Sequence, residues 1–225
     1  MTEDTLSATM RDYLVHVYRL ADAGVPEQPV GTSELADVLQ VSPPAVNRMV
    51  TKLRELGYLQ HERYQGITLT TSGQQEALKQ LRRHRIVEAF LVNVMGFGWH
   101  EVHYEAERMA SSLDDRVVQR MYDMAGSPTE SPHGAPIPTL EGVIPTFDDV
   151  PLAHVEPHHN YELRRVLTHE PDRLEYLAAL GLKPGVILKL LHIAPFNGPI
   201  QLQLGREYRI IGHTLAEHLR VRQAD

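Results

Sequence analysis

The chain has 225 residues, a formal net charge of −7 and 42% hydrophobic residues, which suits two or three small domains. It has no cysteine, which excludes disulfides, thiolate zinc sites and iron–sulfur clusters, so any chemistry must use histidine, carboxylate or hydroxyl groups. The sequence begins without a signal-peptide pattern, and no later segment has the roughly 18 apolar residues of a membrane span. We therefore expect a cytoplasmic protein with no membrane partner.

The first third of the chain carries helix signals and then strand signals. Apolar spacing and capping residues (Thr32 or Ser33, then Ser42) predict three helices, at 10–21, 34–39 and 43–56. Alternating residues predict two strands, at 58–61 and 67–70, joined by a loop. Helix, helix, turn, helix and hairpin is the order of a winged helix-turn-helix.

The acidic net charge argues against indiscriminate nucleic-acid binding, but charge varies along the chain. Basic residues outnumber acidic ones between 42 and 63, where the second helix of the helix-turn-helix and the wing lie. Arg48 and Asn47 are candidates for reading guanine and adenine, respectively, and Lys52 suits a phosphate. The full set of candidate DNA contacts is Ser42, Pro43, Pro44, Asn47, Arg48, Lys52 and Arg63.

Apolar residues at helical spacing continue after the wing and are followed by strand-like patterns. Two long helices are predicted at 72–94 and 99–125, separated by a Gly-Phe-Gly turn. Residues 127–145 are rich in proline and glycine and predict the start of a linker. Strand-like runs at 162–167, 187–195, 199–204 and 207–211, with one short helix near 172–180, then predict a small β-barrel.

Two histidine–glutamate pairs stand four residues apart on the predicted long helices. His84 and Glu88 form one pair, and His103 and Glu107 form the other. Residues four apart share a helix face, and the short turn between the helices allows the two faces to meet. The pairs are therefore candidate metal ligands, with hydrogen-bonded surface pairs as the alternative interpretation.

Six segments resemble the diphtheria-toxin-repressor family of metal-dependent regulators, including its manganese-sensing branch. They are RDYLVHVYRL, SPPAVNRMV, ERYQGITLTTSG, RRHRIVEAFL, EVHYEAERM and SPHGAPIP. The resemblance runs nearly from end to end and implies a mainly α protein with a small β part. It implies an N-terminal winged helix-turn-helix at 1–73, a helical metal-binding and dimerisation domain at 74–146, and a C-terminal SH3-like (FeoA-like) β-barrel at 147–225.

The resemblance also implies two metal sites. Residues that match ligands of the family's ancillary site are His84, Glu88, His103 and Glu170. Asp12 and Glu107 fall at the primary site, where the manganese-sensing branch has carboxylates and the iron-sensing branch has sulfur ligands. Oxygen ligands favour the harder Mn²⁺ over later transition metals.

The chain departs from the family at both sites. Ala110 and Ser111 stand where a Glu and a His complete the primary site, and Val15 replaces a carboxylate of the first helix. Arg173 replaces a glutamine near the ancillary site and cannot donate a lone pair, which leaves Asp172 as a possible substitute. Either the ion rests mainly on the ancillary set or nearby donors substitute, of which the nearest are His16, His100 and Glu105.

The function that the resemblance implies is repression of metal-uptake and homeostasis genes by a metal-loaded homodimer on a palindromic, double-stranded operator. We expect Mn²⁺ to be the effector, with Fe²⁺ as the alternative, and Zn²⁺ or Cd²⁺ to bind in vitro. Metal binding would fix the distance between the two recognition helices of the dimer.

Three alternatives remain. The chain could respond to an organic ligand or lack metal control, because its primary site is altered. A metal-dependent hydrolase is a further alternative, but no HExxH, GxSxG or Walker motif is present, so we expect no enzyme activity. Residues 132–145 could bind the barrel as a proline-rich peptide instead of forming a plain linker.

Overall fold

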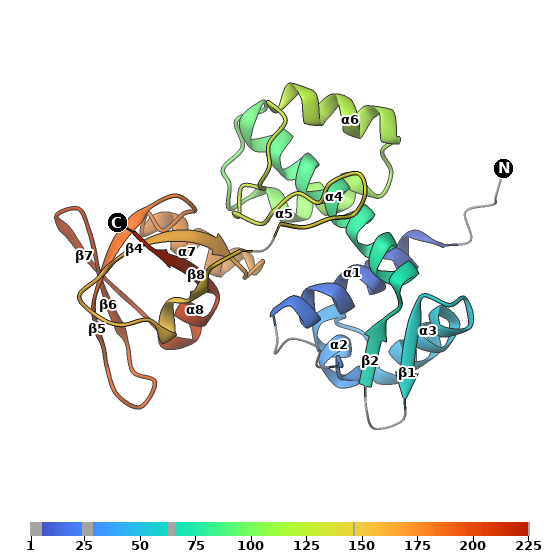
Figure 1. Cartoon of the computed structure of the whole chain (residues 1–225), viewed down its shortest axis with the longest axis horizontal. Helices are drawn as coiled ribbons and strands as arrows, with labels where there is room; N and C mark the ends of the chain where they lie inside the picture. Colours follow the sequence, from blue (N-terminus) through green and yellow to red (C-terminus); the bar gives the residue numbers. More distant parts are fainter. Residues whose placement is uncertain (1–5, 24–28, 63–65, 146, 225) are drawn as a thin grey trace. The chain divides into compact units, whose positions relative to one another are not determined.

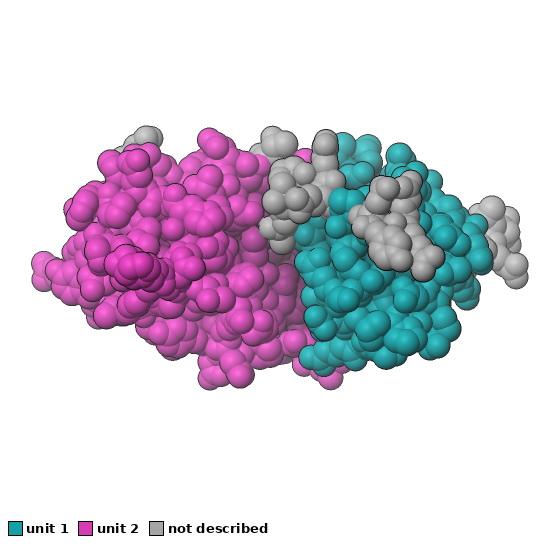
Figure 2. All heavy atoms as spheres, turned by 90° about the horizontal axis from the view of Figure 1, so that it is seen from below, with its two compact units in different colours: residues 1–83, 138–143 teal, residues 84–137, 144–225 magenta. Residues whose placement is uncertain are grey.

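The computed structural model describes residues 6–23, 29–62, 66–145 and 147–224. The chain divides into two compact units, which Figure 2 colours separately: residues 1–83 with 138–143, and residues 84–137 with 144–225. Each unit is described by itself below. The expected architecture, helical with a small β part, is confirmed.

The first unit is a winged helix-turn-helix (Figure 1). Its elements are α1 (Ala8–Ala23), α2 (Thr32–Leu39), α3 (Pro43–Glu55), β1 (Leu59–Glu62), β2 (Gly66–Leu69) and the first turns of α4 (Thr71–Asn93). The two strands pair antiparallel, with Leu59 opposite Leu69. Fully buried Leu14, Leu35 and Leu53 form the centre of the core, so the apolar stripes of all three helices face one another.

The beginning of α2 differs from the sequence expectation. The helix starts at Thr32, and the capping position belongs to Gly31, which has no side chain to accept a hydrogen bond. The turn to α3 uses Gln40 in the left-handed conformation, with its N–H donated to the carbonyls of Ala36 and Asp37. Ser42 then occupies the N-cap position of α3, as expected, although its hydroxyl makes no capping hydrogen bond.

The expectation of one helix over 99–125 was wrong. The structure has two helices there, α5 (Val102–Ala110) and α6 (Asp115–Met124). The break follows from Asp114, whose carboxylate accepts a hydrogen bond from the Arg116 N–H and begins a new helix. The apolar faces of α4, α5 and α6 pack together around buried Val87, Val102 and Val118.

The C-terminal part of the second unit is a six-stranded antiparallel sheet in the order β3-β8-β4-β5-β6-β7. Its elements are β3 (Val150–Pro151), the 3₁₀ helix η1 (Leu152–His154), β4 (Asn160–Val166), α7 (Pro171–Ala179), β5 (Ile187–Ile193), β6 (Ile200–Leu204), β7 (Glu207–Ile211), α8 (His213–Glu217) and β8 (Leu219–Gln223). Sequence patterns predicted four of these strands and α7, but missed β3, β8, η1 and α8.

A bulge in β4 shapes the edge of this sheet. Leu163 pairs with Val221 and Arg165 with Arg220, so Arg164 is the extra residue on β4. A bulge bends its strand and redirects the backbone groups of the extra residue. The Arg164 carbonyl lies against Gly134 of the loop 129–137.

None of the described helices is long and apolar enough to cross a membrane.

Candidate metal centre and DNA-binding face

The two helices that follow the wing bring three expected metal ligands together. His84 and Glu88 lie one turn apart on the same face of α4, and His103 lies in the first turn of α5. The side chains of all three are at least 92% buried. Burying charged and polar groups costs free energy unless they are paired or bind an ion. A cluster of three such side chains therefore indicates a binding site.

The three side chains converge on one point. The Glu88 Oε1 lies 2.9 Å from the His84 Nε2 and 3.1 Å from the His103 Nδ1. The two ring nitrogens are 3.2 Å apart. Within the described part of the chain, this is the group whose ligand atoms lie close enough together to hold a metal ion.

The Glu88 carboxyl is held in its ionised form. Burial raises its pKa, but the neighbouring imidazoles of His84, His133 and His103 outweigh burial and keep the pKa well below its usual value. A buried carboxylate that stays charged among imidazoles is a strong ligand for a divalent cation.

The sequence analysis missed His133 as a site residue. Its imidazole is buried, and its Nδ1 lies 3.4 Å from the Glu88 Oε1. Among the described residues, neither ring nitrogen of His133 has a hydrogen-bond partner. An unsatisfied buried polar group costs about 1–3 kcal/mol, so two such nitrogens beside a carboxylate fit a site that binds a cation.

The loop 129–137 holds His133 against the sheet. The His133 carbonyl accepts a hydrogen bond from the Val166 N–H, and the Arg164 guanidinium pairs with Glu130 at 2.8 Å. Gly134 has φ +79°, and a Cβ atom there would lie 1.8 Å from the Arg164 carbonyl oxygen. Only glycine allows this contact, so the loop sequence His133-Gly134 fixes the imidazole next to Glu88. In the sequence, His133 belongs to the segment SPHGAPIP, which has neither helical nor strand spacing, so no periodic pattern marked it as a site residue.

The expected ligand Glu170 does not point toward the cluster in this structure. Its carboxylate is exposed and pairs with the Arg173 Nε at 2.8 Å. Its neighbour His169 lies instead beside His103, with ring centroids 4.0 Å apart. The arginine that replaces the family glutamine therefore engages the carboxylate that the resemblance assigned to the metal.

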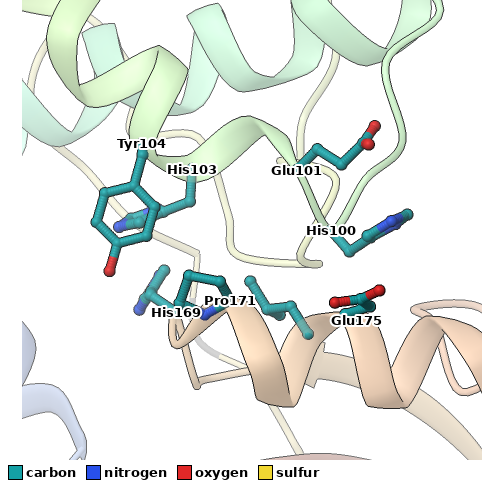
Figure 3. Close-up of a pocket in the computed structure, with 8 residues that line it drawn as sticks. His100, Glu101, His103, Tyr104, His169, Pro171 and Glu175 are labelled. Carbon is teal, nitrogen blue, oxygen red and sulfur yellow. The ribbon is translucent and has the colours of Figure 1, made fainter.

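A pocket of about 250 Å³ opens next to this cluster, between the start of α5 and α7 (Figure 3). His103 and Tyr104 line one wall, and His169 and Pro171 line the facing wall. At the other end of the pocket, Glu175 of α7 faces the loop that carries His100.

The two carboxylates expected at a primary site belong to different units, Asp12 to the first and Glu107 to the second, and both are half-buried. Ala110, at a position where the family has a ligand, is buried in the apolar core of α4 and α5. Of the substitute donors, Glu105 pairs with Arg108 on α5.

The expected DNA contacts on α3 share one exposed face. The exposed residues are Ser42, Pro43, Pro44, Asn47, Arg48 and Lys52. Val46, Val50 and Leu53 are fully buried on the opposite face and fix the helix to the core. The expected wing contact Arg63 lies outside the described residues.

Family models match three successive parts of the chain. The iron dependent repressor N-terminal DNA binding domain matches residues 5–67, the iron dependent repressor metal binding and dimerisation domain matches 70–139, and the FeoA domain matches 150–223.

Individual proteins show the same similarity. An uncharacterized HTH-type transcriptional regulator of Methanocaldococcus jannaschii is 36% identical over 116 residues, which are 52% of this chain and 91% of the relative. The iron-dependent repressor IdeR of Mycobacterium leprae is 36% identical over 132 residues, which are 59% of this chain and 56% of that protein. The solved structure of a manganese-dependent transcriptional repressor in complex with manganese has a TM-score of 0.89 and 31% identity, covering 96% of this chain and 100% of that one.

Proposed function

Because the chain belongs to the iron-dependent repressor family, whose members are metal-dependent DNA-binding regulators and not enzymes, we propose that it represses metal-uptake and homeostasis genes when Mn²⁺ is bound. In this proposal the winged helix binds a palindromic operator in the cytoplasm, and the chain acts as a homodimer. The proposed domains are residues 1–73 for DNA binding, 74–146 for metal binding and dimerisation, and 147–225 for the SH3-like part.

The observation that carries the proposal is that one continuous helix, α4, contributes both to the winged-helix core and to the buried cluster. The helix begins two residues after the wing strand β2, and its Ala77 is part of the winged-helix core. The same helix carries His84 and Glu88 into the buried cluster. Helix rise is 1.5 Å per residue, so only about 10–17 Å of continuous helix separates Ala77 from these ligands. An ion that orders this part of α4 would therefore order the same helix that packs, through Ala77, in the winged-helix core.

His84, Glu88, His103 and His133 are the proposed ligands of the main ion. Imidazole nitrogens and a carboxylate oxygen suit Mn²⁺, Fe²⁺ and Zn²⁺, and the ion would supply the positive charge that the carboxylate and the buried ring nitrogens attract. Glu170 remains the family's candidate, and the pair Asp12 and Glu107 is the proposed second site.

Mn²⁺ is the proposed effector for two reasons. Asp12 and Glu107 are hard oxygen donors at the position where the resemblance implies the second ion. The solved structure with a TM-score of 0.89 is of a manganese-dependent repressor. Fe²⁺ is the alternative. Zn²⁺ would bind in vitro because affinity rises along the first-row series. Cd²⁺ would bind as well, as it does in the solved structure of the similar protein ScaR.

The proposed contacts with the operator lie on α3 and the wing. Asn47 and Arg48 would read bases, while Ser42, Lys52 and Arg63 would contact phosphates. Pro43 and Pro44 would bring the beginning of α3 close to the major groove. Linkage requires that DNA tighten metal binding by the same factor by which metal tightens DNA binding.

The experiment has two steps. The full-length protein loaded with Mn²⁺ selects its operator from a random duplex pool, and fluorescence anisotropy then measures the Kd with Mn²⁺ and with chelator at one salt concentration. His84→Ala is compared with Arg83→Ala, which changes the preceding residue on α4. We expect Mn²⁺ to strengthen binding at least tenfold in the parent and in Arg83→Ala, but not in His84→Ala.

Equal operator affinity with Mn²⁺ and with chelator would refute the metal switch and favour the alternative of a regulator that senses an organic ligand or lacks metal control. A gain that Fe²⁺ produces and Mn²⁺ does not would replace manganese by iron as the effector.

A further inference from the structure

We propose that His169, and not Glu170, is the residue through which the C-terminal domain binds the metal ion held by His84, Glu88, His103 and His133. The inference rests on the proposed function as a metal sensor and adds a ligand to the same site. It concerns a position where this chain departs from the family pattern, because Arg173 has replaced a neutral side chain.

The first argument is the distance between imidazole rings. Two imidazoles that bind one ion through nitrogens about 2.1 Å from it have ring centroids at most about 6.5 Å apart. His169 lies 4.0 Å from His103 and 5.9 Å from His133 by this measure. The pairs inside the buried cluster have similar separations, 4.8 Å for His84 and His103 and 6.2 Å for His103 and His133. His169 therefore satisfies the same distance criterion as the buried histidines.

The second argument is the direction of the backbone before α7. Glu170 is the N-cap residue of this helix, and its N–H is donated to the hydroxyl of buried Thr168. This turn directs two adjacent side chains differently. His169 lines the pocket beside His103, whereas Glu170 is absent from the pocket lining and is exposed (Figure 3).

The third argument is charge. Glu170 forms an ion pair with Arg173 across one turn of α7, so ligation would require the carboxylate to leave a cation. Arg173 would also place a second positive charge near the bound ion. Ligation through the His169 imidazole would leave the Glu170–Arg173 ion pair intact, and so avoids both costs.

The chemical consequence is a site rich in nitrogen. With His169, four imidazoles and one carboxylate surround the ion, whereas the family pattern implies two carboxylates. Imidazole suits iron, cobalt and zinc better than it suits manganese, and carboxylate does the reverse. The C-terminal domain of this chain would therefore raise Co²⁺ affinity more than Mn²⁺ affinity.

The test compares two adjacent substitutions in the full chain, His169→Ala and Glu170→Ala, with Co²⁺ and Mn²⁺ as probes. Competition with a chromophoric chelator gives the Kd for Co²⁺. The visible spectrum of the bound Co²⁺ reports its ligands, and pulsed electron paramagnetic resonance of bound Mn²⁺ detects coupled imidazole nitrogens. Circular dichroism verifies that each variant is folded.

We expect His169→Ala to weaken Co²⁺ binding at least tenfold, to change the Co²⁺ spectrum and to remove one coupled nitrogen, while Glu170→Ala changes the Kd less than twofold. The reverse pattern would overturn the inference and restore the family carboxylate. No effect of either substitution would also overturn it. His84→Ala separates these results from failure of the proposed function, because a Co²⁺ affinity unaffected by His84→Ala would mean that the buried cluster binds no metal.

Discussion

The Nε2 of His84 lies 3.2 Å from the Nδ1 of His103, and the Glu88 Oε1 lies within 3.1 Å of both. Both ring nitrogens can donate an N–H to this oxygen only with the two N–H groups converging at this short separation. A divalent ion would take the place of both protons, because it accepts both lone pairs and the carboxylate oxygen together. Metal binding, as proposed above, would account for a buried, polar cluster inside an otherwise apolar helical layer.

Glu88→Gln tests the charge of this cluster. The amide retains the size of the carboxyl but cannot supply the negative charge that attracts the ion. We expect the Kd for Co²⁺ to rise about 100-fold or more, because a lost buried charge pair costs about 3 kcal/mol or more. Isothermal titration calorimetry measures this change. Glu101→Gln, at an exposed carboxyl that lines the pocket but lies outside the buried cluster, is the control and should retain parental affinity; equal losses in the two variants would contradict the assignment.

Gly134→Ala tests the loop that holds His133. A Cβ atom would collide with the Arg164 carbonyl at a backbone angle already unfavourable for alanine. We expect the free energy of unfolding to fall by about 2 kcal/mol or more and metal affinity to fall with it.

The matched control is Gly126→Ala, also at positive φ but with nothing within 4 Å of the added Cβ. Only the conformational cost of about 1 kcal/mol applies there. Urea unfolding and Co²⁺ titration measure both effects, and similar metal affinities in the two variants would show that the loop does not position His133.

Arg48→Ala and Lys52→Ala separate base reading from phosphate binding. Arg48→Ala should cost about 1–3 kcal/mol on the selected operator and relax its sequence preference. Lys52→Ala should weaken binding to all sequences alike and reduce the slope of log K against log salt by about one. Anisotropy titrations at several salt concentrations measure both quantities. A sequence preference unchanged by Arg48→Ala would assign that side chain to the backbone of the DNA instead.

Glu162→Gln tests the pH dependence of the C-terminal sheet. Burial raises the pKa of the Glu162 carboxyl, but Arg164 and Arg222 at 2.8 and 2.9 Å outweigh it, so the pKa lies below its usual value. A lowered pKa in the folded state means that the unfolded state binds the proton first as the pH falls. The stabilisation is therefore present near neutral pH and is lost as the pH falls through the lowered pKa.

At pH 7, parent and Glu162→Gln should differ by about 1 kcal/mol, a value that solvent screening keeps small. The difference should disappear in acid, and urea unfolding at a series of pH values measures it. A difference that persists unchanged at low pH would show that the Glu162 charge contributes nothing.

The sequence predicted the winged helix and α4 well because local signals there agree with tertiary packing. The apolar residues of α3 recur at helical spacing, and Val46, Val50 and Leu53 are all fully buried. The break between α5 and α6 was missed because Ser111 to Asp114 interrupts an amphipathic pattern that resumes with nearly the same period. Propensity alone cannot show that Asp114 caps a second helix.

The candidate metal cluster could be predicted from the sequence only where its residues lie on helices. His84 and Glu88 share a face because they are four apart, a relationship visible in the sequence. His133 lies in a loop, and its place beside Glu88 depends on the contact of Gly134 with a bulge 30 residues later. The difference in direction between His169 and Glu170 likewise depends on the turn that begins α7, which no periodicity encodes.

The hydrogen bond from the Val166 N–H to the His133 carbonyl has a consequence for how this protein can change over evolutionary time. This hydrogen bond joins the C-terminal sheet to the loop that carries His133 through main-chain atoms alone. Any residue except proline at position 166 retains the donor, so the surrounding side chains can diverge without separating sheet and loop. The residue type is restricted at position 134 instead, because the Arg164 carbonyl leaves room only for glycine there.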